Sequence, residues 1–227
     1  MLAAVVALFV ASAATAVVGS LTGRRALVAV TKPLTTLLLF PVLGWPGMPV
    51  AWWIAAGLVL SLGGDIALLG STKRAFMAGL VLFLLAHVAY IVGFIEATAW
   101  ALGSRGLPVA PMTVAAIAVG ISTALLLRRL WPGAGELRVP VAIYGVVISA
   151  MVVSAVAAVF SRPSLPLSLP LGLAPVGAVG AVLFYISDAA LALNLFHRPF
   201  RWAPLLTLGV YWLGQLGIAW AARLASG

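Results

Sequence analysis

Five ionisable side chains lie inside or near the long apolar runs of this sequence. They are Lys32, Asp65, His87, Glu96 and Asp188. A charged group at membrane depth costs ~2.5–3.5 kcal/mol on insertion scales, so such groups are rare and usually mark a functional site. Two carboxyl groups in an apolar site suit acid and base catalysis, whereas acids in a transporter relay protons. Both interpretations stay open here, and Glu96 is predicted to be a solvated residue near a helix end.

Polar side chains accompany these groups at helical spacing. The pairs are Ser61 with Asp65, His87 with Tyr90, Tyr185 with Asp188, and Tyr211 with Gln215. Residues three or four apart share one face of a helix, and a polar face in a membrane belongs inside a bundle. We predict that Asp65 and Asp188 carry the chemistry. The predicted binding residues are Lys32, His87, Tyr90, Tyr144, Tyr185, Tyr211 and Gln215.

Each candidate also has a structural interpretation. Lys32 can extend its charged end to the membrane surface, or pair with an aspartate that has no catalytic role. His87 can be a hydrogen-bonded packing residue, and the tyrosines can be packing or interfacial residues. A site is therefore predicted only where several of these groups converge.

The composition requires membrane helices to position these residues. Of the 227 residues, 64% are hydrophobic and 7% are charged, whereas a soluble domain carries about 25% charged residues. One span needs about 20 apolar residues, so eight spans with short connections account for the chain. The predicted spans are 2–21, 26–43, 50–70, 75–97, 108–127, 139–160, 171–196 and 203–223. We predict an all-α, polytopic membrane helix bundle that forms a single transmembrane domain over residues 1–227.

Basic residues concentrate in alternate connections between the predicted spans. One set contains Arg24, Arg25, Lys73, Arg74, Arg128, Arg129, Arg138, Arg198 and Arg201, and the other contains Arg105, Arg162 and Arg223. Cytoplasmic loops of membrane proteins are enriched in Lys and Arg. The asymmetry therefore predicts that the larger set is cytoplasmic and that the N- and C-termini lie outside.

Depth along the spans predicts where the site lies. At a rise of ~1.5 Å per residue, Lys32, Asp65 and Asp188 lie ~8–12 Å from the cytoplasmic ends of their spans. We predict that these three side chains line one cavity in the cytoplasmic half. Tyr144, Tyr185 and His87 are expected near it.

Charge and residue counts limit the partners. The net charge of +9 does not indicate nucleic acid, because the basic residues lie between apolar runs, where they set topology and meet lipid headgroups. The chain has no cysteine, two histidines and four acidic residues. We predict the lipid bilayer as the surroundings, with no nucleic acid, no metal and no organic cofactor.

Five motifs occur in a characteristic order along the spans. They read Lys32-Pro33-Leu34-Thr35-Thr36, Gly64-Asp65, Phe83-Leu-Leu-Ala-His87-Val-Ala-Tyr90, Gly180-Ala-Val-Leu-Phe-Tyr-Ile-Ser-Asp188 and Tyr211-Trp-Leu-Gly-Gln215. Each is weak alone, but their order and spacing together are fairly specific. Over nearly its whole length the sequence resembles the YhhN/TMEM86 family of lysoplasmalogenases.

The resemblance implies a function and a site. It implies eight spans and hydrolysis of the vinyl ether bond of a lyso-ether phospholipid, which gives a fatty aldehyde and a glycerophospho-alcohol. It also implies that the two essential acids are Asp65 and Asp188. The chemistry agrees, because protonation of a vinyl ether gives an oxocarbenium ion and needs one protonated carboxyl and one carboxylate. Lys32 would hold the phosphate or keep one aspartate ionised.

Two other functions stay open at this point. A small multi-pass transporter or lipid-binding protein would use the buried acids for proton or ligand coupling, and a hydrolase of the same mechanism could act on a different lyso-lipid. Aldehyde release from a lysoplasmalogen would distinguish the first from a lysoplasmalogenase. The richness in Ala and Val suggests a GC-rich bacterial genome, so the predicted location is the cell membrane, the inner membrane of a bacterium.

Overall fold

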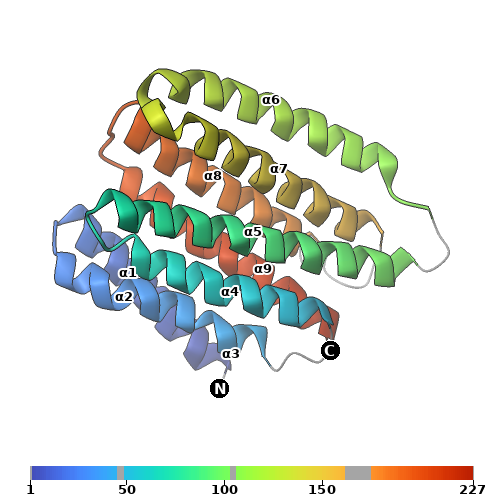
Figure 1. Cartoon of the computed structure of the whole chain (residues 1–227). Helices are drawn as coiled ribbons and strands as arrows, with labels where there is room; N and C mark the ends of the chain where they lie inside the picture. The colour runs from blue at the N-terminus through green and yellow to red at the C-terminus, as the bar shows by residue number, and fades with distance from the viewer. Residues whose placement is uncertain (1, 45–48, 103–105, 162–174, 227) are drawn as a thin grey trace.

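The computed structural model describes residues 2–44, 49–102, 106–161 and 175–226, and every regular element within these ranges is a helix (Figure 1). The predicted all-α class is confirmed. The α-helices are α1 (Leu2–Leu21), α2 (Arg25–Leu37), α3 (Leu39–Leu43), α4 (Pro49–Ala67), α5 (Lys73–Leu102), α6 (Val109–Ala134), α7 (Arg138–Phe160), α8 (Val176–Phe196) and α9 (Val210–Ser226). A 3₁₀ turn, η1 (Gly135–Leu137), precedes α7, and a π-helical turn, η2 (Leu205–Gly209), precedes α9.

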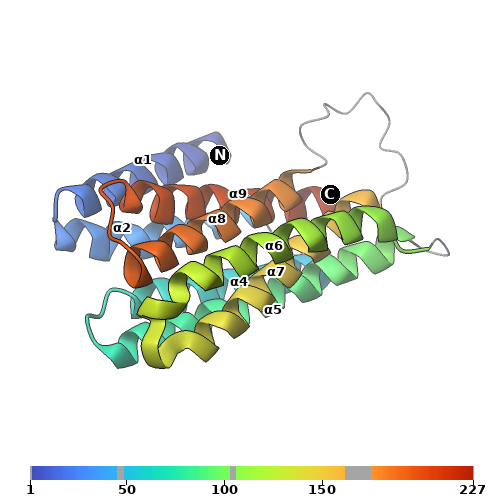
Figure 2. The same cartoon turned by 90° about the horizontal axis from the view of Figure 1, so that it is seen from above.

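The helices lie side by side in one bundle, as Figures 1 and 2 show from two directions. In the middle, α4, α5, α7, α8 and α9 form a closed ring in which each helix packs against the next. The first helices, α1 and α2, lie against one side of this ring, and α6 lies on the opposite side against α7 and α8. The interior of the ring is therefore the most enclosed part of the molecule.

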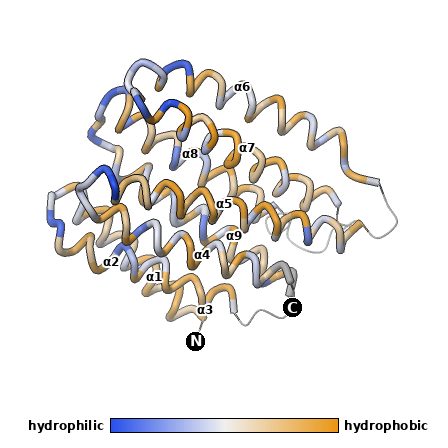
Figure 3. Tube along the Cα trace, in the orientation of Figure 1, coloured by the Kyte–Doolittle hydropathy of each residue, from blue (hydrophilic) through white to orange (hydrophobic). Residues whose placement is uncertain are grey.

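Several helices are long and apolar enough to cross a membrane. Six stretches within the described ranges have this character: Leu2–Leu21, Arg25–Leu43, Lys73–Leu102, Val109–Phe160, Val176–Phe196 and Leu205–Leu224. The stretch Val109–Phe160 contains both α6 and α7, and Ala51–Ala67 in α4 is a shorter apolar helix. Figure 3 shows apolar residues along the helices and hydrophilic residues in the connections at one end. The chain is a multi-pass membrane protein.

The predicted span 26–43 is interrupted in the structure. It consists of α2 and α3, which are separated at Leu38. Pro41 has no N–H for the carbonyl of Leu37, and its ring crowds that carbonyl. The helix therefore breaks one turn before this proline.

The predicted fifth span, 108–127, lies almost entirely within a helix that extends further. It was expected to stop at Leu127, but α6 continues through Arg128 and Arg129 to Ala134. Long arginine side chains can leave a helix sideways and reach water, so a pair of them does not end it. Residues 171–174, predicted as the start of the seventh span, lie outside the described ranges.

The connections that hold most of the basic residues gather at one end of the bundle, which we call the basic end (Figure 3). At this end Lys73, which begins α5, forms an exposed ion pair with Glu136 of η1. The hydrogen bond and positive charge of Lys73 lower the pKa of Glu136. α1 begins and α9 ends at the opposite end (Figure 1). Arg105 and Arg162, predicted for that side, lie outside the described ranges.

Two glycines allow α8 and α9 to approach closely. A Cβ on Gly180 would lie 2.6 Å from the carbonyl oxygen of Gly214, and a Cβ on Gly214 would lie 2.8 Å from the carbonyl oxygen of Gly180. Any larger residue would push the two backbones apart. This contact fixes the position of Asp188 on α8 relative to Tyr211 on α9.

Candidate active site

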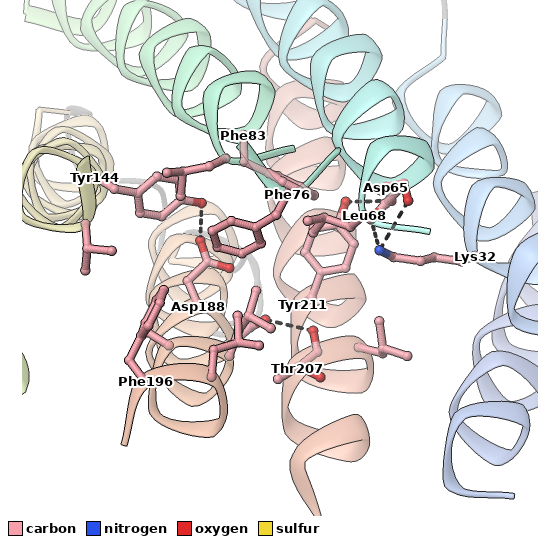
Figure 4. A pocket seen from close by; sticks show the side chains of 17 residues that line it. Lys32, Asp65, Leu68, Phe76, Phe83, Tyr144, Asp188, Phe196, Thr207 and Tyr211 are labelled. Atoms are coloured by element: carbon pink, nitrogen blue, oxygen red, sulfur yellow. Dashed lines mark hydrogen bonds and ion pairs between the residues drawn. The ribbon is translucent and has the colours of Figure 1, made fainter. Parts of the chain in front are cut away.

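A pocket of about 130 Å³ lies in the half of the bundle near the basic end (Figure 4). Its polar lining residues are Lys32, Asp65, Tyr144, Ser187, Asp188, Thr207 and Tyr211. The other lining residues are apolar and include Leu80, Val141, Leu191 and Leu195. Apolar walls with a few converging polar groups are typical of a site for a small organic ligand.

Asp65, near the end of α4, is surrounded by hydrogen-bond donors and is only 1% exposed. Its Oδ2 accepts hydrogen bonds from the hydroxyls of Thr36 at 2.6 Å and Tyr211 at 3.0 Å. The Nζ of Lys32 lies 3.3 Å from Asp65 Oδ1 and donates to the Asp65 backbone carbonyl, also at 3.3 Å (Figure 4). One positive charge and two hydroxyl donors suit a carboxylate.

A chain of hydrogen bonds continues behind Asp65. Gln215 Nε2 donates to the Tyr211 hydroxyl at 3.2 Å, and Tyr90 donates to Gln215 Oε1 at 2.6 Å. Ser61 Oγ lies 3.4 Å from the Tyr90 hydroxyl, which has already given its one proton to Gln215. Ser61 is therefore the donor in that contact, and every donor in the chain points towards Asp65.

Asp188, on α8, lines the pocket across from Asp65 (Figure 4). Its side chain is 16% exposed, and its Oδ2 accepts a hydrogen bond from the Tyr144 hydroxyl at 2.5 Å. His87 Nε2 lies 3.8 Å from the same oxygen, which is too far for a hydrogen bond. Within the part of the chain that the structure describes, Asp188 therefore has one donor and no lysine or arginine partner.

His87 presents an acceptor to Asp188. Its Nδ1 lies 2.6 Å from the backbone carbonyl of Phe83, and because a carbonyl only accepts, Nδ1 carries the proton. In the neutral imidazole Nε2 then has a lone pair, and this atom is buried without a hydrogen-bond partner. A proton on the Asp188 carboxyl would have this acceptor close by.

Aromatic rings pack tightly around these polar groups. The ring of Phe184 lies edge-to-face against Phe83, Tyr211 and His87, with centroids 6.2, 5.1 and 4.6 Å away. Gly64, which precedes Asp65, makes room for Phe83, since a Cβ there would lie 2.7 Å from the Phe83 ring. The rings limit the movement of the two carboxyls.

The structure brings most of the sequence-predicted residues together, in two layers. Lys32, Asp65, Tyr144, Asp188 and Tyr211 line the pocket itself. His87, Tyr90 and Gln215 lie behind this lining and reach it through Asp188 or Tyr211. Their predicted direct contact with a substrate stays a prediction.

Tyr185 lies on the wall of a different, smaller cavity. This cavity, of about 40 Å³, is formed with α6 and shares Tyr144 and Asp188 with the main pocket. The Tyr185 hydroxyl is hydrogen-bonded to Ser122 at 2.9 Å and Thr123 at 3.0 Å. It thus points towards α6 instead of the main pocket.

Sequence reasoning did not identify two residues that support Asp65, one by direct contact and one through the first. Thr36 donates directly to the carboxylate, and Trp212 orients this hydroxyl by donating its Nε1 proton to Thr36 Oγ1 at 3.3 Å. Thr36 follows Lys32 by four residues, so it shares a helix face with the lysine, and this spacing was the available signal. Within the described ranges, no three His, Asp or Glu side chains gather as a metal site.

The chain belongs to the YhhN family, whose model matches residues 27–222. It is 30% identical to the human lysoplasmalogenase TMEM86B over 171 residues, which are 74% of this chain and 62% of the relative. It is 29% identical to rat TMEM86B over 86% of this chain and 72% of the relative. It is also 35% identical to a Mycobacterium tuberculosis lysoplasmalogenase, over 63% of this chain and 50% of the relative.

The matched region spans only part of the relatives' length: half of the mycobacterial protein, 62% of human TMEM86B and 72% of rat TMEM86B. No solved structure matches the chain.

Proposed function

We propose that this protein hydrolyses the vinyl ether bond of lysoplasmalogen-type lyso-ether phospholipids. The observation that carries the proposal is one apolar pocket lined by two carboxyls with opposite surroundings. The names of the TMEM86B and mycobacterial relatives support it. The products would be a fatty aldehyde and a glycerophospho-alcohol.

Asp188 is the better candidate for the acid, and Asp65 for the carboxylate. Asp65 faces the ammonium group of Lys32 and two hydroxyl donors, which favour its charged form. Asp188 has one phenol donor and, among the described residues, no lysine or arginine at ion-pair distance, so its charged form is stabilised less than that of Asp65. Groups whose environments differ in this way can divide acid and base roles.

The proposed reaction begins with proton transfer from Asp188 to the vinyl carbon that is β to the ether oxygen. The π electrons form the new C–H bond, and an oxocarbenium ion results, whose charge the Asp65 carboxylate stabilises. Water adds to the cationic carbon and loses a proton to a carboxylate. As the C–O bond to glycerol breaks, the hemiacetal hydroxyl loses its proton and the glycerol oxygen takes one up, which gives the aldehyde and the free hydroxyl. The proton released by water restores Asp188, so no net proton is consumed.

The proposed role of Lys32 is to keep Asp65 charged and in place. Its Nζ contacts both the carboxylate and the backbone carbonyl of Asp65. This supports the second of the two roles considered from the sequence, in preference to a grip on the phosphate. The apolar wall that contains Leu80, Leu191 and Leu195 would then hold the start of the alkenyl chain.

We further propose that the chain forms one transmembrane domain with eight spans and with both termini outside. The stretch Val109–Phe160 turns at η1, so α6 and α7 would be separate spans, and α4 would be another. The position of the basic end supports a cytoplasmic location for it. The pocket would then open in the cytoplasmic half of the cell membrane, which we propose is a bacterial inner membrane.

The test is aldehyde release from a lysoplasmalogen by the purified protein in detergent. Saturated 1-O-alkyl lysophospholipid is the matched control, because it lacks the double bond that accepts the proton. We expect aldehyde from the first lipid only. If the wild-type protein releases none while binding both lipids, a lipid-binding or transport function replaces hydrolysis.

A further inference from the structure

A second cavity lies next to the pocket at the basic end, and we call it the vestibule. It measures about 700 Å³, and its lining includes residues 20–22 at the end of α1, 68–69 after α4, and 200–204 before η2. The vestibule and the pocket share Lys32, Leu68, Thr207 and Leu208. The two cavities are therefore neighbours, and a lipid that lay across the shared residues would reach both.

Polarity changes along this path. The pocket has mainly apolar walls, whereas the vestibule is lined by Ser20, Thr22, Asn194 and Arg201 among its polar groups. Two of its described lining residues, Lys32 and Arg201, are cationic, and none is acidic. This is the pattern expected for an anionic headgroup attached to an apolar chain.

The charge of Lys32 is already engaged. Its Nζ lies 3.3 Å from both Asp65 Oδ1 and the Asp65 carbonyl, and the residue is 7% exposed. Arg201 is exposed at the vestibule, where its guanidinium stacks 5.2 Å from the centre of the Trp202 ring. Stacking holds a planar group whose N–H donors match the oxygens of a phosphate.

We propose that Arg201 binds the phosphodiester of the single-chain lipid in the vestibule and thereby selects phosphorylated over neutral lyso-lipids. This inference rests on the proposed function, because it assumes that the ether bond lies in the pocket. A few covalent bonds separate the ether oxygen of a glycerophospholipid from its phosphorus. A lipid with its ether bond beside Asp188 and Asp65 therefore extends its phosphate into the vestibule.

The experiment measures binding without turnover. The probes are 1-O-alkyl lysophosphatidylethanolamine and 1-O-alkylglycerol, both saturated, in neutral detergent with the full chain. In Arg201→Gln we expect roughly tenfold weaker binding of the phospholipid, the size of one charge-assisted hydrogen bond, and unchanged binding of the alkylglycerol. Arg201→Lys should retain part of the affinity, because it retains the charge.

Arg198→Gln is the matched control. Arg198 lies in the same connection at the basic end but does not line the vestibule. Equal weakening by Arg198→Gln and Arg201→Gln would assign the effect to overall surface charge and overturn the subsite. Unchanged affinity of Arg201→Gln, or equal weakening for both ligands, would also overturn it.

Competition with inorganic phosphate shows whether the subsite accepts free phosphate or only the phosphate of a lipid. If it displaces the phospholipid from wild type but not from Arg201→Gln, the subsite also accepts free phosphate; if it does not compete, the phosphate is held only as part of the lipid. Either result supports the subsite once the Arg201 dependence is established. If that dependence holds but the wild type releases no aldehyde, the proposed function fails and the subsite stands.

Discussion

The two aspartates differ in what their oxygens can accept or give. Asp65 is held by Lys32, Thr36 and Tyr211, which can only favour its charged form, while Asp188 meets one phenol and one imidazole lone pair. In the proposed mechanism one carboxyl keeps its proton until the vinyl ether arrives, and the surroundings of Asp188 oppose this less than those of Asp65. Both residues are aspartates, so the different roles proposed for them rest on the side chains that surround each one.

Replacing either aspartate should abolish most of the activity. Asp65→Asn and Asp188→Asn keep size and polarity but remove the titrating group, and general acid catalysis alone contributes typically 10²–10⁴-fold. We expect at least about a hundredfold loss of aldehyde release for each. Glu96→Gln is the control, since Glu96 is exposed on α5 away from the pocket lining. Near-normal turnover in a folded aspartate variant would refute the two-carboxyl mechanism.

Lys32→Met should lower kcat more than it raises KM. The lysine contacts Asp65, so its loss affects the charge that stabilises the oxocarbenium ion, while Arg201 remains to bind phosphate. We expect a fall in kcat of roughly tenfold or more, the cost of one lost charge-assisted contact. Steady-state kinetics with a lysoplasmalogen measures both constants. A rise in KM alone would return Lys32 to the role of phosphate ligand.

At the scale of the helices, the contact between α8 and α9 determines the geometry of the pocket. Gly180 and Gly214 bring the two backbones together, so Asp188 and Tyr211 face one cavity. Next to it, the π-helical turn η2 places Thr207 at the pocket, and the Thr207 carbonyl accepts a hydrogen bond from Ser187 of α8 at 2.9 Å. Such turns often occur at functional sites.

Gly214→Ala should therefore reduce both stability and activity. The new Cβ would lie 2.8 Å from backbone atoms of Gly180 and Phe184, which cannot rotate away, and overpacking of this kind costs about 1–3 kcal/mol. Gly120→Ala in α6 is the matched control, because nothing lies within 4 Å of its Cβ position. Thermal unfolding in detergent should show a lower Tm for the first variant only. Equal Tm values would contradict the close contact.

The sequence was sufficient for the all-α class and for grouping the main polar residues, but not for the break between α2 and α3 or for the directions of the side chains. Equal depth correctly placed Lys32, Asp65 and Asp188 in one pocket. Tyr185 shows the limit, because three residues of a helix with 3.6 per turn leave it about 60° away from Asp188. That angle turns its hydroxyl to α6. Tertiary packing decides which helix lies on that side of α8, and it also decides that Thr36 donates to Asp65. Neither can be read from the sequence of one helix.

At the scale of the whole molecule, the basic end and the pocket lie in the same half of the bundle. Lys73 and Glu136 pair across two connections of that end, and the vestibule opens there as well. If these connections are cytoplasmic, as we propose, substrate and product exchange with the inner leaflet. The orientation can be tested without disturbing the site.

The absence of cysteine from the sequence makes the orientation test direct. Glu136→Cys in η1 and Leu107→Cys before α6 introduce single thiols at exposed positions in connections at opposite ends of the bundle. With a membrane-impermeant maleimide added to intact cells, we expect labelling at position 107 and none at position 136 until the cells are permeabilised. Labelling of position 136 in intact cells would invert the topology.

The hydrogen-bond chain from Ser61 to Asp65 also determines where catalytic protons come from. Protons hop readily through hydroxyls, but the chain passes through the amide of Gln215, which would have to change its bonding to pass one on. We therefore expect the chain to orient Asp65 and not to supply it with protons from the other half of the bundle. In the proposed reaction the attacking water supplies the proton that restores Asp188, and Asp188 exchanges protons with the pocket that it lines. In a vesicle with a pH gradient, turnover should then follow the acidity of the compartment at the basic end and ignore the other.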